Sequence, residues 1–297
     1  VGRELAPREM GALLAQRWEM LLAKWHLDTL TADDRRLLIA AAAGAGFAGI
    51  YIAPITGMLF AVEILHKNVS KRSVSVSLGM SLIAMLVGAS IKGFHPYYFV
   101  ADRHFDLKML PFVIVVGPIM GIAGAYFRKV FQWAGGKAKA KQVQVLWQLP
   151  LAALATGIVA YFFPQIMGNG RGLAELAINN ESTKLIGMLA IGMILKAVIT
   201  VFTLKAGAYG GTLAPSIGIG GSFGAILGFA YVMMMPGASI DQAAVIGATA
   251  LLSASQQAPL MALFMMFEVT HMDYSALLPM GLSVVLAITT SKLILKK

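Results

Sequence analysis

The strongest constraint on the fold is a series of roughly ten apolar segments separated by short polar links. Charged residues make up only 13% of the chain, whereas soluble domains carry about 25%. So few charges cannot cover the surface of a soluble protein. The sequence therefore predicts an all-α, multi-pass integral membrane protein surrounded by the lipid bilayer.

Two of the apolar segments are too short to cross a membrane as straight helices. Segments 53–65 and 258–270 fall below the ~20 residues that span hydrocarbon. Short segments interrupted by Gly and Pro, in matching places of two halves, mark binding sites in transporters. We therefore expect short, broken, tilted helices among longer ones, which lie at 9–24, 37–52, 73–91, 110–127, 145–163, 185–203, 212–235, 242–253 and 276–294.

The net charge of +10 has a membrane explanation, because the basic residues lie in short loops. Cytoplasmic loops of membrane proteins are rich in Lys and Arg, which places loops 67–72 and 128–141 in the cytoplasm and loop 92–109 outside. We therefore expect no nucleic-acid partner. The five histidines are not in ligand spacing and there is no cysteine, so no metal site or cofactor is predicted.

Two short patterns recur in the same order. Residues 2–7 read G-R-E-L-A-P and residues 210–215 read G-G-T-L-A-P. Each copy is followed, 47 or 44 residues from proline to proline, by an Ala-Pro pair with a glutamate nine residues further on. This predicts an internal duplication within one transport domain, with 1–104 as the end of the first repeat and 105–297 as the second. By that alignment, roughly 100 residues of the first repeat belong upstream of Val1, and the chain is expected to be a truncated fragment without a soluble regulatory domain.

The chemistry of the repeated phrase indicates an anion site. A Gly-rich turn that opens a helix presents free backbone N–H groups, and the helix dipole adds positive potential there. Such a helix start binds an anion without a cationic side chain. Glu4 lies in the first copy, where its carboxylate would compete with the ion and be released by protonation. The simpler alternative is a first-turn glutamate that complements the dipole.

The order of these motifs resembles the CLC family of chloride channels and chloride/proton antiporters. The resemblance rests on G-R-E followed by Pro, on G-G-x-Φ-x-P at a later helix start, and on A-P-L-x(7)-E-V-T. It implies the family's inverted-repeat fold, in a homodimer whose subunits each hold a pore formed by converging helix N-termini. It also implies transport of a small inorganic anion, chloride by default, with a bound chloride ion, in a prokaryotic plasma membrane.

The resemblance assigns roles by position. Glu4 matches the gating glutamate, backbone amides at Gly2, Arg3 and Leu5 match the outer anion site, and amides at Gly211, Thr212 and Leu213 match the central one. The antiporters carry an inner glutamate just after the position of Glu63, where this chain has Ile64. Glu63 and Ile64 are therefore the candidate inner proton path.

Several functions stay open at this point. Ile64 favours a channel without proton coupling, and the alternative is an anion/proton antiporter for chloride or fluoride that couples through Glu4. A different broken-helix transporter that carries a cation would need carbonyl oxygens, whereas G-G-T-L-A-P supplies N–H groups. An enzyme is not expected, because no nucleophile and base lie at a recognisable spacing.

Overall fold

The computed structural model describes the chain except residues 1, 3, 28–29, 137–138, 180–182 and 297. The chain forms two compact units. One contains Glu4–Tyr97, and the other contains Tyr98–Lys297 together with residues 1–3. These units are defined by contacts within the structure. The division into repeats between residues 104 and 105 is based on sequence similarity and stays a prediction.

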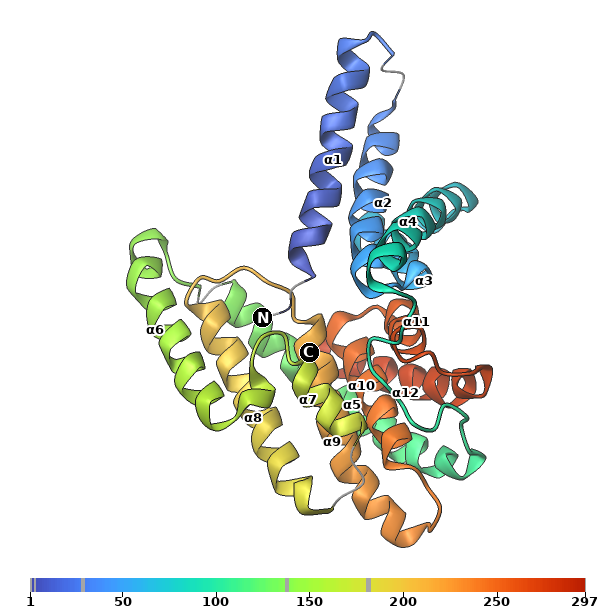
Figure 1. Ribbon diagram of the computed structural model, residues 1–297, viewed down its shortest axis with the longest axis vertical. Coiled ribbons are helices and arrows are strands. Elements are labelled where there is room, and N and C mark those ends of the chain that lie inside the picture. The colour runs from blue at the N-terminus through green and yellow to red at the C-terminus, as the bar shows by residue number, and fades with distance from the viewer. Residues whose placement is uncertain (1, 3, 28–29, 137–138, 180–182, 297) are drawn as a thin grey trace. The chain divides into compact units, whose positions relative to one another are not determined.

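Among its described residues, the Glu4–Tyr97 unit contains four α-helices and one π-helix. Figure 1 shows the α-helices of this unit in blue to teal. These are α1 (Leu5–Lys24), α2 (Ala32–Tyr51), α3 (Pro54–Leu59), the π-helix η1 (Phe60–His66) and α4 (Lys71–Lys92).

The Tyr98–Lys297 unit contains eight α-helices with short 3-10 turns between some of them. The described helices are α5 (Leu110–Gly135), α6 (Gln142–Phe162), α7 (Arg171–Ile178), α8 (Ile186–Lys205), α9 (Leu213–Met234), α10 (Ile240–Gln256), α11 (Pro259–Thr270) and α12 (Leu277–Leu295). The 3-10 turns are η2 (Leu107–Met109), η3 (Pro164–Ile166), η4 (Thr183–Leu185) and η5 (Tyr274–Ala276).

Six helical segments among the described residues are long and apolar enough to cross a membrane. The segments Pro54–His66 and Pro259–Thr270 are apolar but shorter, as the sequence predicts. The six long segments are Lys71–Lys92, Leu107–Gly135, Gln142–Phe162, Ile186–Lys205, Leu213–Met234 and Tyr274–Leu295. The protein is therefore a multi-pass integral membrane protein, and the mixture of long and short helices agrees with the expected broken-helix architecture.

Three boundaries differ from the sequence expectation. Helix α2 begins at Ala32 rather than near residue 37, because Thr31 and Asp34 form a capping box that opens the helix within the polar link. Helix α5 continues to Gly135, so most of the expected basic loop 128–141 that the structure describes is helical. The polar stretch after residue 168 contains the short helix α7.

Close helix packing explains several of the glycines. Gly247 of α10 faces α9, where a Cβ would lie 2.5 Å from the Gly220 carbonyl oxygen. Gly46 of α2 faces α1 in the same way, with 2.1 Å to the Pro7 carbonyl oxygen. Small residues at such positions let backbones approach closely, which is the usual packing of membrane helices.

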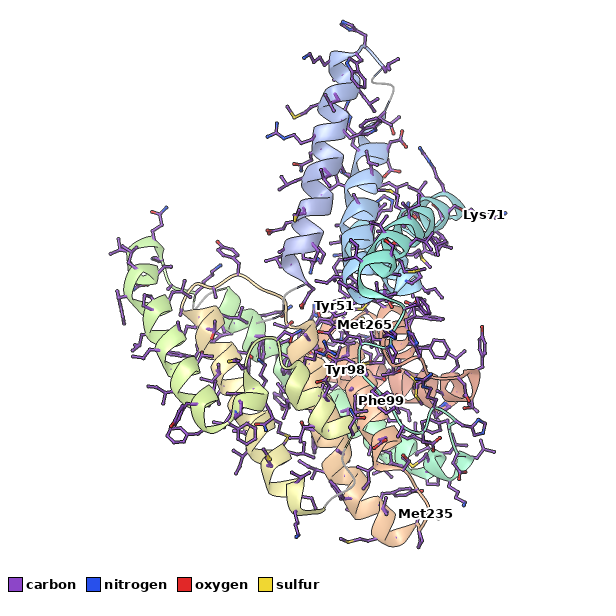
Figure 2. All side chains as sticks on the ribbon, viewed as in Figure 1. Tyr51, Lys71, Tyr98, Phe99, Met235 and Met265 are labelled. Atoms are coloured by element: carbon purple, nitrogen blue, oxygen red, sulfur yellow. The ribbon has the colours of Figure 1, made fainter. Side chains whose placement is uncertain are left out.

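The interior of the Tyr98–Lys297 unit is formed by α9, α10 and their neighbours. Every residue from Ile240 to Ser255 is buried, and so is the first turn of α9. Tyr98 and Met265, labelled in Figure 2, are 1% and 0% exposed, whereas Phe99 next in the chain is 58% exposed. The start of α9 is thus embedded in a packed core.

Candidate anion-binding site

In both copies of the repeated phrase, a helix begins at the leucine in the fourth position. Helix α1 begins at Leu5 with Glu4 as its N-cap, and α9 begins at Leu213 with Thr212 as its N-cap. The first N–H groups of an α-helix have no partner within the helix, and the dipole makes that end positive. The prediction that these turns open helices is confirmed, and each start has the chemistry of an anion site.

The first residues of the two phrases are in direct contact. The Gly2 N–H donates to the Gly211 carbonyl oxygen at 2.7 Å, in an isolated antiparallel bridge. Gly2 is buried and belongs to the same unit as Gly211. Residues 209 positions apart are therefore joined at the turn that opens α9. Arg3, the third residue predicted for the outer site, lies outside the described residues.

Glu4 and Leu5 belong to the Glu4–Tyr97 unit. Glu4 is fully buried, and Leu5 is half-buried. Arg8 follows Glu4 by one helical turn, so the two lie on the same face of α1 and interact electrostatically. The Arg8 guanidinium lies 4.4 Å from the centre of the Phe60 ring. Glu4 is thus a buried carboxylate at a helix start.

A hydrogen-bond network fixes the start of α9. Ser216 Oγ donates to the Thr212 carbonyl oxygen at 2.7 Å and lies 3.0 Å from Ser255 Oγ. Gln256 Nε2 donates to Thr212 Oγ1 at 3.2 Å. Leu213 is buried, and Gly211 and Thr212 are half-buried. The predicted central-site residues therefore occupy a rigid turn that is braced by the C-terminal end of α10.

The candidate inner proton path lies in a π-helix. Glu63 and Ile64 are both half-buried members of η1. Their counterpart Glu268 lies in the regular helix α11. Single π-helical turns mark one-residue insertions and are frequent at functional sites. The π-helix cannot be predicted from the sequence, because an extra residue in an apolar helix leaves no compositional signal.

The buried Lys196 side chain binds backbone carbonyl oxygens, which indicates a structural role. Its ammonium donates to the carbonyl oxygens of Ile166 at 3.0 Å and Gly168 at 2.7 Å, and the residue is 1% exposed. These bonds fix the turn that precedes α7. No group of three or more potential metal ligands occurs in the part of the chain that the structure describes.

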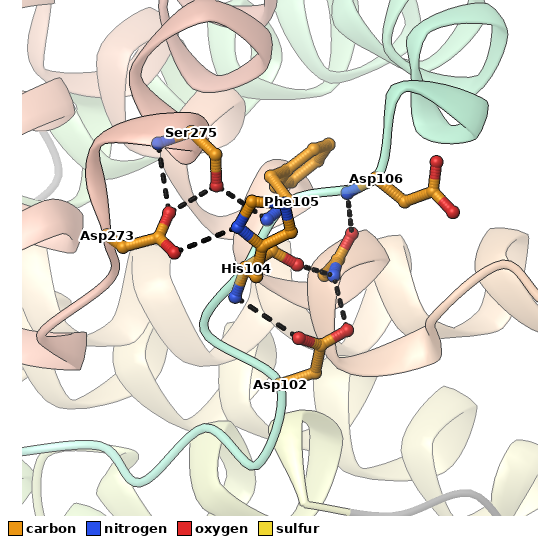
Figure 3. A network of polar contacts seen from close by, with 7 residues as sticks. Asp102, His104, Phe105, Asp106, Asp273 and Ser275 are labelled. Atoms are coloured by element: carbon orange, nitrogen blue, oxygen red, sulfur yellow. Dashed lines mark hydrogen bonds and ion pairs between the residues drawn. The ribbon is translucent and has the colours of Figure 1, made fainter.

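A second polar cluster, in loop 98–106, was not anticipated (Figure 3). Buried Gln242 donates to Asp102 Oδ2 at 2.8 Å and to the His104 carbonyl oxygen at 2.7 Å. His104 Nδ1 lies 3.1 Å from Asp273 Oδ2. Hydrogen bonds from Ser275, followed by the bond with His104, hold the pKa of Asp273 below its ordinary value. Partners more than 130 residues apart could not be paired from the sequence.

The chain resembles curated chloride-transport proteins along nearly its whole length. It is 27% identical to a "Putative chloride channel protein ClcB-like" of Ralstonia nicotianae, over 98% of this chain and 67% of the relative. It is 29% identical to an "H(+)/Cl(-) exchange transporter ClcA" of Cronobacter sakazakii, over 94% of this chain and 60% of the relative. The chain thus spans roughly three fifths to two thirds of the length of these relatives.

Solved structures show the same fold. A slow cyanobacterial Cl⁻/H⁺ antiporter matches with a TM-score of 0.86 and 22% identity, over 99% of this chain and 68% of its own. A CLC-type fluoride/proton antiporter matches with a TM-score of 0.77 and 23% identity, over 98% and 70%. The family model described as "Voltage gated chloride channel" matches residues 1–292. With its helical architecture and its two repeated Gly-rich helix starts, the chain belongs to the voltage gated chloride channel family, the CLC family.

Proposed function

We propose that the full-length protein transports a small inorganic anion, chloride by default, and that Glu4 gates the transport. The observation that carries the proposal is the hydrogen bond from Gly2 to Gly211. This bond joins the first copy of the repeated phrase to the turn that opens α9, and Glu4 belongs to the same phrase as Gly2. A carboxylate at one copy of an amide anion site competes with the ion, and protonation removes that competition.

The same helix-start chemistry leads us to expect a bound anion. We expect chloride to accept hydrogen bonds from backbone N–H groups at Thr212 and Leu213, because α9 begins there inside a packed core. An amide site binds without a fixed cationic side chain and is weak enough to release its ion, as conduction requires.

The test is anion efflux from liposomes that contain the full-length protein, measured as a function of pH. Glu4→Gln mimics the protonated carboxylate, and we expect it to keep or raise flux and to flatten its pH dependence. Glu9→Gln on the same helix is the matched control, because Glu9 is exposed. If Glu4→Gln and Glu9→Gln both retain the wild-type pH profile, Glu4 is not the gate.

Proton coupling is the second candidate, and the position of Glu63 favours testing it. Glu63 lies in the π-helix beside Ile64, where an inner proton acceptor is expected in antiporters. Two relatives of known structure or name are described as exchangers of chloride and protons. A chloride gradient that drives proton uptake in the wild type, but not in Glu63→Gln, would establish an antiporter. No proton movement in the wild type would establish a channel.

We also propose a homodimer in the bilayer, as the family resemblance implies. The exposed side chains of α4 are apolar and suit either lipid or a second subunit, for example Ile83, Leu86 and Val87. Single-molecule photobleaching of the labelled full-length protein in liposomes distinguishes a monomer from a dimer. We expect two bleaching steps per complex, and a single step would exclude the dimer.

A further inference from the structure

The start of α6 and the end of α8 meet on the side of the Tyr98–Lys297 unit that the charge distribution places in the cytoplasm. The Ala140 N–H, just before α6, donates to the carbonyl oxygen of Lys205, the last residue of α8, at 2.8 Å. Val145, near the start of α6, packs against Gly207, where an added Cβ would lie 2.6 Å from the valine side chain. The two helix ends are therefore joined at one place.

Aromatic rings hold two lysines in place at this junction. The Lys139 ammonium lies 3.2 Å from the centre of the Tyr209 ring. The Lys205 ammonium lies 5.5 Å from the centre of the ring of Trp133, which belongs to the last turn of α5. Such cation–π contacts position an ammonium without neutralising its charge. Tyr209 and Trp133 are 82% and 49% exposed, so both pairs face the surroundings of the protein.

The positive charge of this junction has no acidic counterpart nearby in the chain. The sequence contains no Asp or Glu in residues 107–174 or in residues 182–240, and these two stretches include α5, α6 and α8 in full. In the part of the chain that the structure describes, no ion pair includes Lys139, Lys141 or Lys205. The charge of the junction is therefore available to an anion from outside the protein.

Other basic residues near helix ends have acidic partners. Arg72, in the basic loop 67–72, forms an ion pair with Asp34 near the start of α2. On the opposite side of the Tyr98–Lys297 unit, the Lys108 ammonium lies 3.7 Å from the Asp106 carboxylate. The lysines at the junction of α5, α6 and α8 differ from these residues, because they contact rings and not carboxylates.

The surface that continues from the lysines along α6 is apolar and exposed. Figure 1 shows α6 at the edge of its unit, beside α8. One face of α6 carries apolar side chains at helical spacing, each at least 47% exposed: Val143, Leu146, Trp147, Leu151 and Leu154. An apolar stripe that begins next to a group of cations matches an amphipathic anion, whose chain lies along the helix while its charged group contacts the lysines.

We propose that the junction of α5, α6 and α8 binds an anionic phospholipid of the cytoplasmic leaflet. The headgroup phosphate lies at Lys139, Lys141 and Lys205, and the acyl chains lie along the exposed face of α6. Lysine clusters immediately cytoplasmic of membrane helices attract anionic lipids, and Trp and Tyr favour the headgroup level of the bilayer. A lipid that binds only the folded protein also stabilises it. The inference does not depend on the proposed anion transport.

The experiment measures lipid binding to the full-length protein in detergent by native mass spectrometry, with phosphatidylglycerol as the anionic probe and phosphatidylcholine as the zwitterionic one. We expect the wild type to prefer phosphatidylglycerol. Lys139→Gln together with Lys205→Gln should raise its Kd for phosphatidylglycerol by about ten- to thirtyfold, because each lysine near the headgroups contributes roughly a fivefold gain in affinity. Arginine at both positions keeps the charges and the ring contacts, so the Kd should stay within about threefold of the wild type.

Lys108→Gln together with Lys184→Gln is the matched control. Both lysines are exposed, and both lie on the opposite side of the same unit, since α6 and α8 each cross the membrane between them and the junction. This variant loses the same amount of charge, and we expect its affinity for phosphatidylglycerol to equal that of the wild type. An equal loss in the two double variants would overturn the site in favour of net charge.

Thermal unfolding in the same detergent separates the remaining outcomes. Phosphatidylglycerol should raise the Tm of the wild type more than that of Lys139→Gln/Lys205→Gln, and inorganic phosphate should raise neither. Equal stabilisation by inorganic phosphate would assign the junction to a soluble anion and overturn the lipid. A lower Tm of the variant without added lipid would mean that the lysines themselves hold the helix ends, which would also overturn the proposal. So would equal affinity of the wild type for the two phospholipids.

Discussion

Helices α1 and α9 begin with the same phrase but have different compositions. Helix α9 contains no charged residue, and much of it is buried. Helix α1 carries several exposed charges, and its N-cap is the carboxylate Glu4, whereas the N-cap of α9 is the hydroxyl of Thr212. The backbone feature is shared, and the N-cap side chain differs. This difference suits a fixed amide site in one copy and a titratable competitor in the other.

The Ala-Pro segments of the two copies are alike where they begin and differ where they end. Ala53 and Ala258 have nearly the same dihedral angles, with φ of −132° and −133° and ψ of 80° and 83°. Each follows a left-handed residue, Ile52 or Gln257, that ends the preceding helix. The helical segment from Pro54 then runs to His66, and that from Pro259 runs to Thr270, one residue shorter. The π-helix η1 accommodates the extra residue.

The largest expected effect comes from making the second N-cap resemble the first. Thr212→Glu places a carboxylate at the start of α9, where we expect it to occupy the amide site. We expect anion flux of the full-length protein to fall about ten- to hundredfold at neutral pH and to recover as the carboxylate is protonated.

Thr212→Gln is the control for that substitution, since it has a similar volume and no charge. We expect it to retain most of the flux. Equal losses in the two variants would mean that the turn tolerates no larger side chain, and the comparison of carboxylate and hydroxyl would then be wrong.

The close packing behind each helix start should be comparably sensitive. Gly247→Ala pushes a methyl group against α9, and Gly46→Ala pushes one against α1. Each should lower the free energy of unfolding by about 1–3 kcal/mol, the usual cost of overpacking. Gly79→Ala is the control, because its added Cβ meets no atom within 4 Å. Thermal unfolding in detergent measures all three, and a loss in Gly79→Ala as large as in the others would contradict the packing argument.

Equivalent glutamates near the ends of the two Ala-Pro segments should behave alike if they are structural. We expect Glu63→Gln and Glu268→Gln each to lower stability by less than about 1 kcal/mol and to leave anion flux within twofold of wild type. The measurement is thermal unfolding paired with liposome efflux. A selective loss of proton movement in Glu63→Gln would instead give the π-helix a function that α11 lacks.

The smallest expected effects concern two carboxylates, one in each unit: the half-buried Asp34 and the exposed Asp273. Hydrogen bonds from Thr31 lower the pKa of Asp34, and hydrogen bonds from Ser275 and then His104 lower that of Asp273. A lowered pKa stabilises the folded state above the ordinary value of 3.8, and this contribution is lost as the pH falls below it. Asp34→Asn and Asp273→Asn should each weaken the pH dependence of thermal stability between pH 5 and 3. Unchanged profiles would show that these bonds do not persist in solution.

The sequence predicts the main elements of this comparison because they depend on local chemistry. Pro54 and Pro259 begin helices since proline is favoured in a first turn, and the glycines before Leu5 and Leu213 allow a turn there. The early start of α2 was missed because a capping box recruits polar residues such as Asp33 into a helix. The family resemblance, rather than periodicity, supplied the inverted-repeat architecture.

Contacts over long sequence distances could not be predicted. Arg128 and Ser255 are 127 residues apart, and neither lies in a recognisable motif. The bond from Gly2 to Gly211 connects the two phrases, but their similarity indicates only common ancestry and not contact. The one-residue difference between the Ala-Pro segments appears only once both ends are known. These features depend on packing, which a single sequence does not encode locally.

The central claim is that the turn before α9 binds an anion for which Glu4 competes. Anomalous X-ray diffraction from crystals of the full-length protein in bromide tests it most directly, in the wild type and in Glu4→Gln. We predict a bromide peak within hydrogen-bond distance of the Thr212 or Leu213 N–H in both proteins, and an additional peak beside residue 4 only in Glu4→Gln. A wild-type crystal without bromide at the start of α9, or identical peaks in the two proteins, would contradict the account.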